Sequence, residues 1–159
     1  MSQNISPLKI AIAGLGVVGG EVARQLMHRQ QQLALASGRA LQLVAVSARS
    51  ATADRGFSMD QIDWHDNAIE LAGRDDVDVI IEMIGGSEGV ALDLTRAALK
   101  NGKHVITANK AMIAHHGAEL ASLAEDHNCY LLFESAVAGG IPAVKTLREG
   151  LAGNDMSRI

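Results

Sequence analysis

Two kinds of hydrophobic pattern alternate along the chain, and together they predict its secondary structure. Short apolar runs favour β-strands, whereas apolar residues spaced three or four positions apart favour helices. The run DVIIEMI at Asp78–Ile84 is nearly continuous, which is typical of a parallel strand covered on both faces. The predicted strands are Lys9–Ala13, Leu41–Ser47, Asp78–Ile84, His104–Thr107 and Tyr130–Glu134. The predicted helices are Val17–Gln31, Ile62–Ala72, Gly89–Asn101, Lys110–His127 and Pro142–Leu151.

The segments between these elements are polar and rich in glycine. Gln30–Ala40 is predicted as a helix end followed by a loop, and Arg49–Met59 as a polar loop. The alternation of strands and helices predicts an α/β fold with a Rossmann-like, doubly wound parallel sheet. We expect a strand order near 3-2-1-4-5, with helices on both faces. Five polar clusters follow predicted strands: Gly14–Gly19, Ser47–Ser50, Gly85–Ser87, Thr107–Lys110 and Glu134–Gly140. They should gather at the ligand-binding edge, outside the carboxyl ends of the strands.

The first of these clusters is a Gly-x-Gly-x-x-Gly sequence between a strand and a helix, which is the context of a dinucleotide-binding turn. Gly14 would permit the tight turn, Gly16 would let the backbone approach a pyrophosphate, and Gly19 would let helix and strand pack closely. Unpaired N–H groups at the start of the helix would face the phosphates. The alternative is a strand-to-helix turn without a ligand. The predicted cofactor-binding residues of this turn are Gly14, Leu15, Gly16, Val17, Val18 and Gly19.

The end of the second strand bears on the choice between NADP and NAD. An NAD-preferring domain usually presents an acid there to the ribose 2′-hydroxyl, but Val46, Ser47 and Ala48 offer none. Arg49 follows directly, and its guanidinium can pair with a 2′-phosphate. The pattern therefore favours NADP, unless Arg49 is simply a solvated loop residue. Asp54, the first acid after the strand, lies far along the loop.

Two further strand ends carry candidate residues. Ile84, Gly85 and Gly86 would let the backbone approach the nicotinamide half of the cofactor, or would simply end the strand. Thr107 and Asn109 precede a helix that Asn109 is suited to cap, which leaves Lys110 in the first turn, where the helix dipole disfavours a cation. Lys110 is therefore a candidate to hydrogen-bond a substrate oxygen or to assist proton transfer, or else it is a surface lysine.

A carboxylate lies inside an apolar strand at Glu82, where burial is costly unless the group is paired. Its role, structural or functional, stays open from the sequence. Glu134 begins a glycine-rich segment whose carbonyl oxygens, with the carboxylate, would suit a hard cation, although a plain loop is the alternative. The six histidines show no metal-ligand spacing, and Cys129 lies among apolar residues and is interpreted as core packing.

Composition narrows the class of protein. The chain has 159 residues, enough for one domain with a sizeable core, and aromatic residues are only 3%, so the core should be aliphatic. A net charge of -4 gives no electrostatic case for nucleic acid or an anionic membrane as partner. One cysteine excludes an internal disulfide, no apolar run is long enough to span a bilayer, and the N-terminus does not resemble a signal peptide. These features favour a cytoplasmic location.

Four segments together resemble the amino-terminal half of homoserine dehydrogenases: IAIAGLGVVGGEV, IIEMIGG, GKHVITANKAMIAHHGAEL and FESAVAGGIPAVKTLREGL. The resemblance runs from about Leu8 to Ile159, and TANK and ESAVAGGIP are its most specific parts. It implies interconversion of L-aspartate 4-semialdehyde and L-homoserine with NAD(P)H, in the threonine and methionine branch of aspartate metabolism. Glu88-Gly89-Val90 departs from the Glu-Pro-Ala expected at that point.

The resemblance also assigns residues. The cofactor would lie on Gly14, Gly16 and Gly19, on the Ile84–Gly86 turn and near Lys110, which would sit close to the reacting groups as a catalytic residue. A monovalent cation, sodium or potassium, would be held by Glu134 and by the backbone carbonyls of Val137, Gly139 and Ile141.

Members of that family continue into a substrate and dimerisation domain, with which the full-length enzyme forms a homo-oligomer and binds its small-molecule substrate. We therefore expect residues 1–159 to be an isolated NAD(P)-binding domain that binds cofactor without efficient turnover, because hydride transfer needs an oriented substrate. The alternatives are the corresponding domain of another amino-acid or semialdehyde dehydrogenase, and a non-catalytic dinucleotide sensor.

Overall fold

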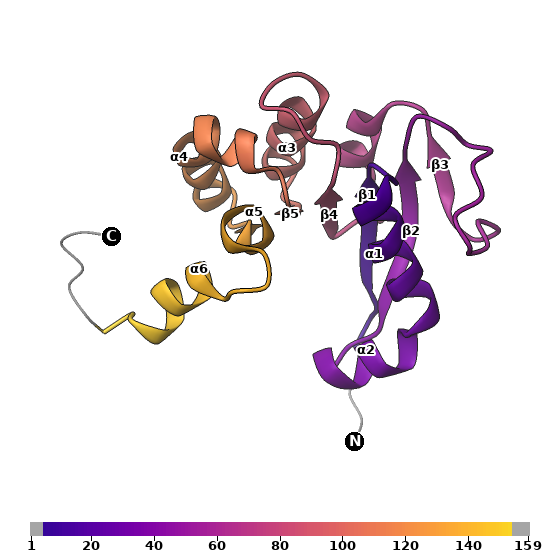
Figure 1. Cartoon of the computed structure of the whole chain (residues 1–159), viewed down its shortest axis with the longest axis horizontal. Coiled ribbons are helices and arrows are strands. Elements are labelled where there is room, and N and C mark those ends of the chain that lie inside the picture. Colours follow the sequence, from indigo (N-terminus) through magenta and orange to yellow (C-terminus); the bar gives the residue numbers. More distant parts are fainter. Residues whose placement is uncertain (1–4, 154–159) are drawn as a thin grey trace.

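A six-stranded, wholly parallel sheet forms the centre of the computed structural model, which describes residues 5–153 (Figure 1). The order across the sheet is β3-β2-β1-β4-β5-β6. This confirms the Rossmann-like prediction and the order near 3-2-1-4-5. The strand that the sequence analysis did not predict is β3, at one edge of the sheet. The strands are β1 (Leu8–Ala13), β2 (Leu41–Ser47), β3 (Asp63–His65), β4 (Val79–Glu82), β5 (His104–Thr107) and β6 (Leu131–Leu132).

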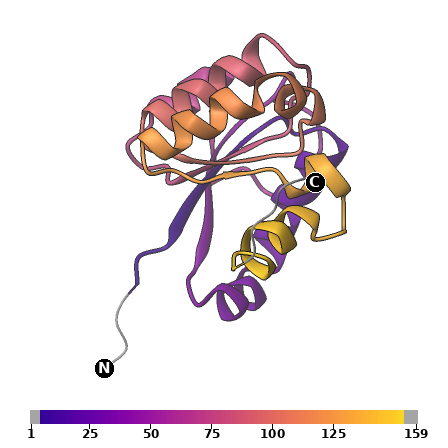
Figure 2. The same ribbon diagram turned by 90° about the vertical axis from the view of Figure 1, so that its left-hand side faces the viewer.

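Helices cover both faces of the sheet (Figure 2). Helices α3 and α4, with the 3₁₀ helix η1, pack on one face, whereas α1 and α2 lie on the other. Within residues 5–153, no helix is both long and apolar enough to traverse a bilayer. The helices are α1 (Val17–His28), α2 (Gln30–Ser37), η1 (Ala68–Gly73), α3 (Val90–Lys100), α4 (Lys110–Asp126), α5 (Glu134–Ala138), α6 (Ala143–Lys145) and the π-helical turn η2 (Thr146–Gly150).

The central strands feed two hydrophobic cores because successive side chains point to opposite faces. In β1, Ile10 and Ile12 pack with α1, whereas Ala11 and Ala13 pack on the face that carries α3 and α4. The core is aliphatic as predicted, and the partly buried Cys129 packs against it, so that burial raises the pKa of its thiol.

The structure corrects the prediction for two segments of the first half. Gln30–Ser37 is helical rather than a loop, and it ends at Gly38, whose φ of 69° is left-handed. This helix buries no residue, so it lacks the apolar periodicity by which a helix is usually found. Ile62–Ala72 is not one helix: Asp63–His65 pairs with β2, and a 3₁₀ helix begins after Asn67, whose side chain accepts a bond from Ile69 N.

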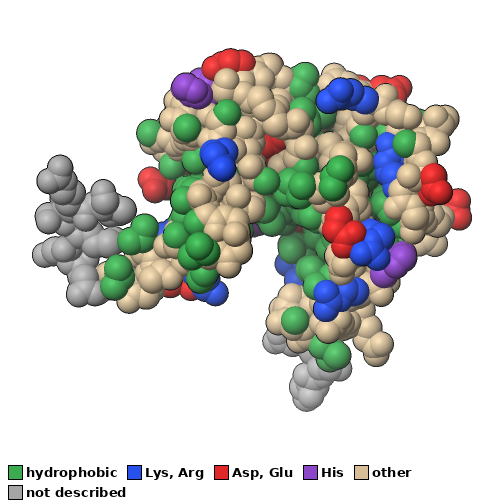
Figure 3. Space-filling view, in the orientation of Figure 1, with side chains coloured by type: hydrophobic (Ala, Val, Ile, Leu, Met, Phe, Trp, Pro, Cys, Tyr) green, Lys and Arg blue, Asp and Glu red, His purple; other side chains and the backbone are tan. Residues whose placement is uncertain are grey.

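The end of the chain also differs from expectation. The last strand is only Leu131–Leu132, and Glu134–Ala138, predicted as a strand end and a flexible loop, forms the short helix α5. The predicted helix Pro142–Leu151 is divided into α6 and the π-helical turn η2. These elements project from the β6 edge, and hydrophobic side chains gather around the hollow between them and the α1–α2 side (Figure 3). Residues 154–159, with the end of the family resemblance, lie outside the described residues, as do residues 1–4.

Candidate dinucleotide-binding site

A cavity of about 720 Å³ opens at the carboxyl ends of β1, β2 and β4. Parallel pairing brings these strand ends to one edge, as the sequence analysis predicts. Five of the predicted cofactor-binding residues line the cavity: Gly14, Leu15, Gly16, Arg49 and Ile84. The others belong to the same turns or to the neighbouring end of β5, but do not line it: Val17, Val18, Gly19, Gly85, Gly86, Thr107, Asn109 and Lys110.

The three glycines of the first turn have different physical requirements. Gly14 has a φ of 95°, and a Cβ there would lie 2.6 Å from the carbonyl oxygen of Met83. A Cβ on Gly19 would lie 1.9 Å from the carbonyl oxygen of Gly14, so α1 packs directly on the turn. A Cβ on Gly16 would meet nothing within 4 Å, and this residue borders the cavity. The space beside Gly16 is therefore the place where a ligand's phosphates can approach the backbone.

Helix α1 begins directly after this turn. Its N-cap is Gly16, and no side chain caps its first N–H groups. Val17 and Val18 are exposed, with 93% and 59% of their surface accessible. An uncapped helix N-terminus presents N–H groups and a positive partial charge to an anion. The residues present thus fit a pyrophosphate.

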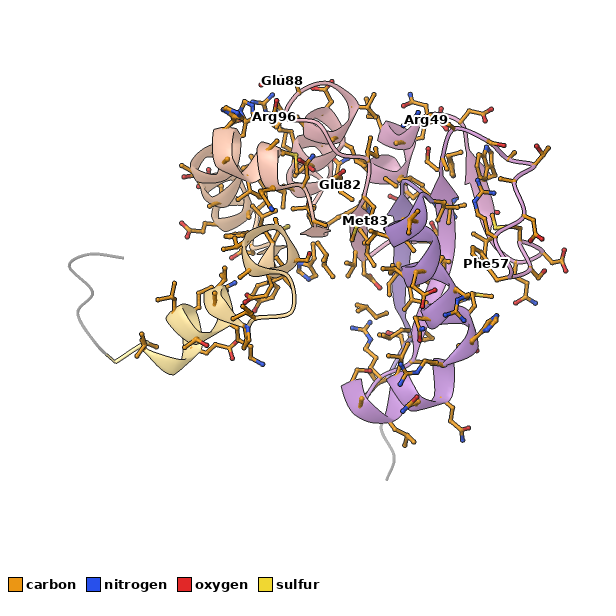
Figure 4. The ribbon with its side chains drawn as sticks, viewed as in Figure 1. Arg49, Phe57, Glu82, Met83, Glu88 and Arg96 are labelled. Atoms are coloured by element: carbon orange, nitrogen blue, oxygen red, sulfur yellow. The ribbon has the colours of Figure 1, made fainter. Side chains whose placement is uncertain are left out.

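Two arginines border the cavity on the β2 side. Arg49 follows the end of β2 and is exposed, above β2 in Figure 4. Arg55 donates hydrogen bonds to the carbonyls of Ala53 and Ser50, and its guanidinium carbon lies 5.4 Å from the ring centre of Trp64. Its Nε is buried and has no hydrogen-bond partner within the described part of the chain. Arg55 was not singled out from the sequence, although a second arginine in the polar loop after β2 was a usable signal.

Beside the cavity, the β4 and β5 ends carry buried polar side chains. Glu82 is fully buried at the end of β4 (Figure 4), and its carboxylate accepts a hydrogen bond from the hydroxyl of Thr107. Asn109 is buried as well, and its side-chain oxygen accepts a bond from Met112 N, which confirms it as the N-cap of α4. Lys110, the first residue of α4, is exposed.

The predicted cation ligands lie apart from the cavity, in and after α5. Both oxygens of Glu134 accept backbone hydrogen bonds, from Val144 N and Lys145 N at 3.0 Å each. The carbonyl of Ile141 accepts a bond from Ala143 N. Val137 lies in α5, and Gly139 follows it. Among residues 5–153, no three His, Cys, Asp or Glu side chains are grouped as a metal site.

Comparisons with known proteins bear on this site. The sequence profile of the family described as "Homoserine dehydrogenase, NAD binding domain" matches residues 14–134. The chain belongs to that family. A homoserine dehydrogenase of Neisseria gonorrhoeae is 39% identical over 98% of this chain, and one of Pseudomonas aeruginosa is 40% identical over 94%. The matched region is 35% and 34% of those two proteins, so the chain spans about a third of the relatives' length.

Solved homoserine dehydrogenases share the fold. The crystal structure from Thiobacillus denitrificans matches with a TM-score of 0.84 and 34% identity, over 96% of this chain and 35% of that one. A hyperthermophilic archaeal homoserine dehydrogenase in complex with NADPH matches with a TM-score of 0.75 and 26% identity, over 92% of this chain and 50% of that one. The glycine turn, β2 to β6 and the first residue of α5 thus fall within the matched homoserine dehydrogenase NAD binding domain.

Proposed function

We propose that this chain is the cofactor-binding domain of a homoserine dehydrogenase, which interconverts L-homoserine and L-aspartate 4-semialdehyde with NAD(P)H. The observation that carries the proposal is the cavity at the carboxyl edge, bordered by Gly16, where a Cβ would meet open space, and by Arg49. Family membership and relatives of that name support it. We expect the enzyme to be cytoplasmic and to serve threonine and methionine synthesis.

The cofactor would lie across the edge of the sheet. Its adenosine half would occupy the cavity, and its pyrophosphate would accept bonds from the first N–H groups of α1. Arg49 would pair with the 2′-phosphate, with Arg55 as a second positive group in the same wall, so NADP is the preferred cofactor. The archaeal relative with NADPH is consistent with this preference. The nicotinamide would reach the Ile84–Gly86 turn, where it supplies the hydride of the reaction.

Lys110 is proposed as the catalytic residue of this domain. It is exposed at the start of α4, next to Asn109, and the neighbouring β5 and β4 ends carry the turn proposed for the nicotinamide. Its ammonium would hydrogen-bond a substrate oxygen or assist proton transfer. Because the relatives are about three times as long, binding of the small-molecule substrate and homo-oligomer formation are proposed for the whole enzyme.

A monovalent cation is proposed at α5, with Glu134 and the carbonyls of Val137, Gly139 and Ile141 as ligands. Carboxylate and carbonyl oxygens are suitable ligands for a hard cation. Both Glu134 oxygens already accept hydrogen bonds from backbone N–H groups of α6, so the cation would share these oxygens with that helix. Thermal melts in sodium, potassium and choline chloride at equal ionic strength test this, with Glu134→Gln as the variant. Equal melting temperatures in all three salts would argue against the site.

The first test of the proposed function is calorimetric titration of this chain with NADPH and NADH side by side. We expect both to bind, and NADPH to bind more tightly. The matched control is Gly16→Val, whose side chain would enter the space beside the turn and should reduce binding of both cofactors. Tighter NADH would leave the family intact but reverse the cofactor preference. Binding of neither would contradict a preformed dinucleotide site.

A further inference from the structure

Glu82 is fully buried at the end of β4, and its carboxylate accepts hydrogen bonds from two different turns of the ligand-binding edge. One carboxylate oxygen accepts from Ile84 N at 2.6 Å and Gly85 N at 3.1 Å. The other accepts from the Thr107 hydroxyl at 2.5 Å. A buried carboxylate is costly without partners, and here three donors satisfy it. All three belong to the turn after β4 or to the end of β5.

The bonds continue from Thr107 into the next turn. The Thr107 hydroxyl accepts a bond from Asn109 N at 2.9 Å, which leaves its proton for Glu82. The Asn109 side chain then donates back to the carbonyl of Gly86 at 2.6 Å, while its oxygen caps α4. The β4 turn and the β5 turn are therefore joined twice, once through Glu82 and once through Asn109.

This connection matters because the β4 turn has little else to fix it. Gly85 and Gly86 have φ values of 82° and 88°, and a Cβ on Gly85 would meet nothing within 4 Å. Glycines in such a turn have wide conformational freedom, which would have to be restricted when a ligand binds. The bonds from Glu82 to the two amides and from Asn109 to Gly86 hold this turn before any ligand arrives.

We propose that Glu82 is a positioning residue, which acts with Thr107 and Asn109 to hold the Ile84–Gly86 turn and the start of α4 in one arrangement for the nicotinamide end of the cofactor. The proposal rests on the proposed function for the identity of the ligand. Glu82 itself does not touch the cofactor; it acts through the backbone of Ile84 and Gly85 and, through Thr107 and Asn109, on the loop that precedes Lys110.

The test compares two ligands that differ only at the end in question. NADPH carries the nicotinamide, whereas 2′-phospho-ADP-ribose lacks it and retains the groups proposed for the cavity and for Arg49. Glu82→Gln and Thr107→Val should each weaken the binding of NADPH by about tenfold, because each leaves a buried polar group without its partner. Both variants should bind 2′-phospho-ADP-ribose within about twofold of the parent chain. Thr107→Ser, which keeps the hydroxyl, should restore the parent ratio of the two affinities.

Equal weakening of both ligands, or of neither, overturns the proposal, since a purely structural role would not separate them. If Glu82→Gln or Thr107→Val fails to fold, Asn109→Ser replaces it. Serine is also a good N-cap for α4, but it is too short to reach the Gly86 carbonyl, so only the second connection is lost. The same selective loss of NADPH affinity is expected for that variant.

A second measurement separates this proposal from the proposed function. If the parent chain binds neither ligand, the proposed function fails, and amide hydrogen exchange then decides on the connection itself. Exchange at Ile84 and Gly85 should be faster in Thr107→Val than in the parent chain, but not in Thr107→Ser. Unchanged exchange in Thr107→Val would show that the two turns are independent, and the inference would be wrong.

Discussion

The two halves of the carboxyl edge are built in opposite ways. The β1–β2 half is open: a cavity lies between Gly16 and Arg49, and the first turn of α1 has no side-chain cap. The β4–β5 half is closed, apart from Met83 and Ile84 at the cavity: Glu82, Thr107 and Asn109 are buried and bonded to one another. Exposed groups of the open half, such as Arg49, can thus contact a ligand without being needed for folding, whereas in the closed half the proposed binding of the nicotinamide and the folding of the domain depend on the same bonds.

The halves meet at two glycines. Gly14 approaches the backbone of Met83, at the end of β4, and Gly19 approaches Gly14 and the Met83 side chain. Backbone atoms at such distances cannot give way as the end of a flexible side chain can. We therefore expect the largest effects at this junction, smaller ones in the open half, and the smallest away from the edge.

Gly19→Ala should be the most damaging single substitution. Its Cβ would lie 1.9 Å from a backbone oxygen, so α1 must move away from β1. We expect a loss of about 3 kcal/mol or more in the free energy of unfolding, or failure to fold, measured by urea denaturation. Gly16→Ala is the matched control, since its Cβ meets nothing and its φ of -70° suits alanine; it should cost under about 1 kcal/mol. Equal unfolding midpoints for the two variants would disprove the packing role of Gly19.

Arg49→Ala tests the open half. The side chain is exposed, so the unfolding free energy should change by less than about 0.5 kcal/mol. Loss of charged hydrogen bonds to a 2′-phosphate should weaken NADPH by about 10- to 100-fold and leave NADH within about twofold, measured by calorimetry. Equal weakening of both cofactors, or none, would remove the reason for preferring NADP.

Asp76→Asn provides a reference far from the ligand edge. The Arg74 guanidinium, bonded to Asp76 at 2.8 Å, holds the pKa of that carboxyl below its usual 3.8. A lowered folded pKa means that the pair stabilises the protein above pH 3.8, and that this contribution is lost as the pH falls through the folded pKa. Asp76→Asn should therefore cost under about 1 kcal/mol at pH 7, since the side chain is 41% exposed.

The difference in stability between Asp76→Asn and the parent chain should shrink as the pH falls below 3.8 and vanish once Asp76 is protonated in the folded state, as followed by thermal melts at decreasing pH. NADPH affinity at pH 7 should not change. A change in affinity would mean that the amino end of β4 influences the ligand edge, and the contrast between the two halves would then be incomplete.

The sequence predicted the features that depend on local pattern. Leu41–Ser47 and His104–Thr107 are observed with the predicted bounds, and Asn109 caps α4, because apolar runs and capping residues act over a few positions. Helix α2 was missed because none of its residues is fully buried and only Leu33 packs partly against the core, and β3 because three residues are too few to establish a period.

The partners of Glu82 were beyond the reach of the sequence for a different reason. Thr107 lies 25 positions away, and the two residues pair only when β4 and β5 align side by side. Arg55 was missed similarly, since its place in the cavity wall follows from the path of an irregular loop. The partners of Glu82 depend on how β4 and β5 align, and the position of Arg55 depends on the path of its loop. Neither can be predicted from residue type alone.

The three glycines of the first turn differ in the space around them, and this difference has an evolutionary consequence. In a lineage that no longer used a dinucleotide, selection for a folded domain would still retain glycine at the positions of Gly14 and Gly19, because backbone atoms occupy the space of a side chain there. The position of Gly16 would be free to drift to larger residues. The middle glycine, rather than the whole three-glycine pattern, is therefore the one that would report whether a descendant still binds its cofactor.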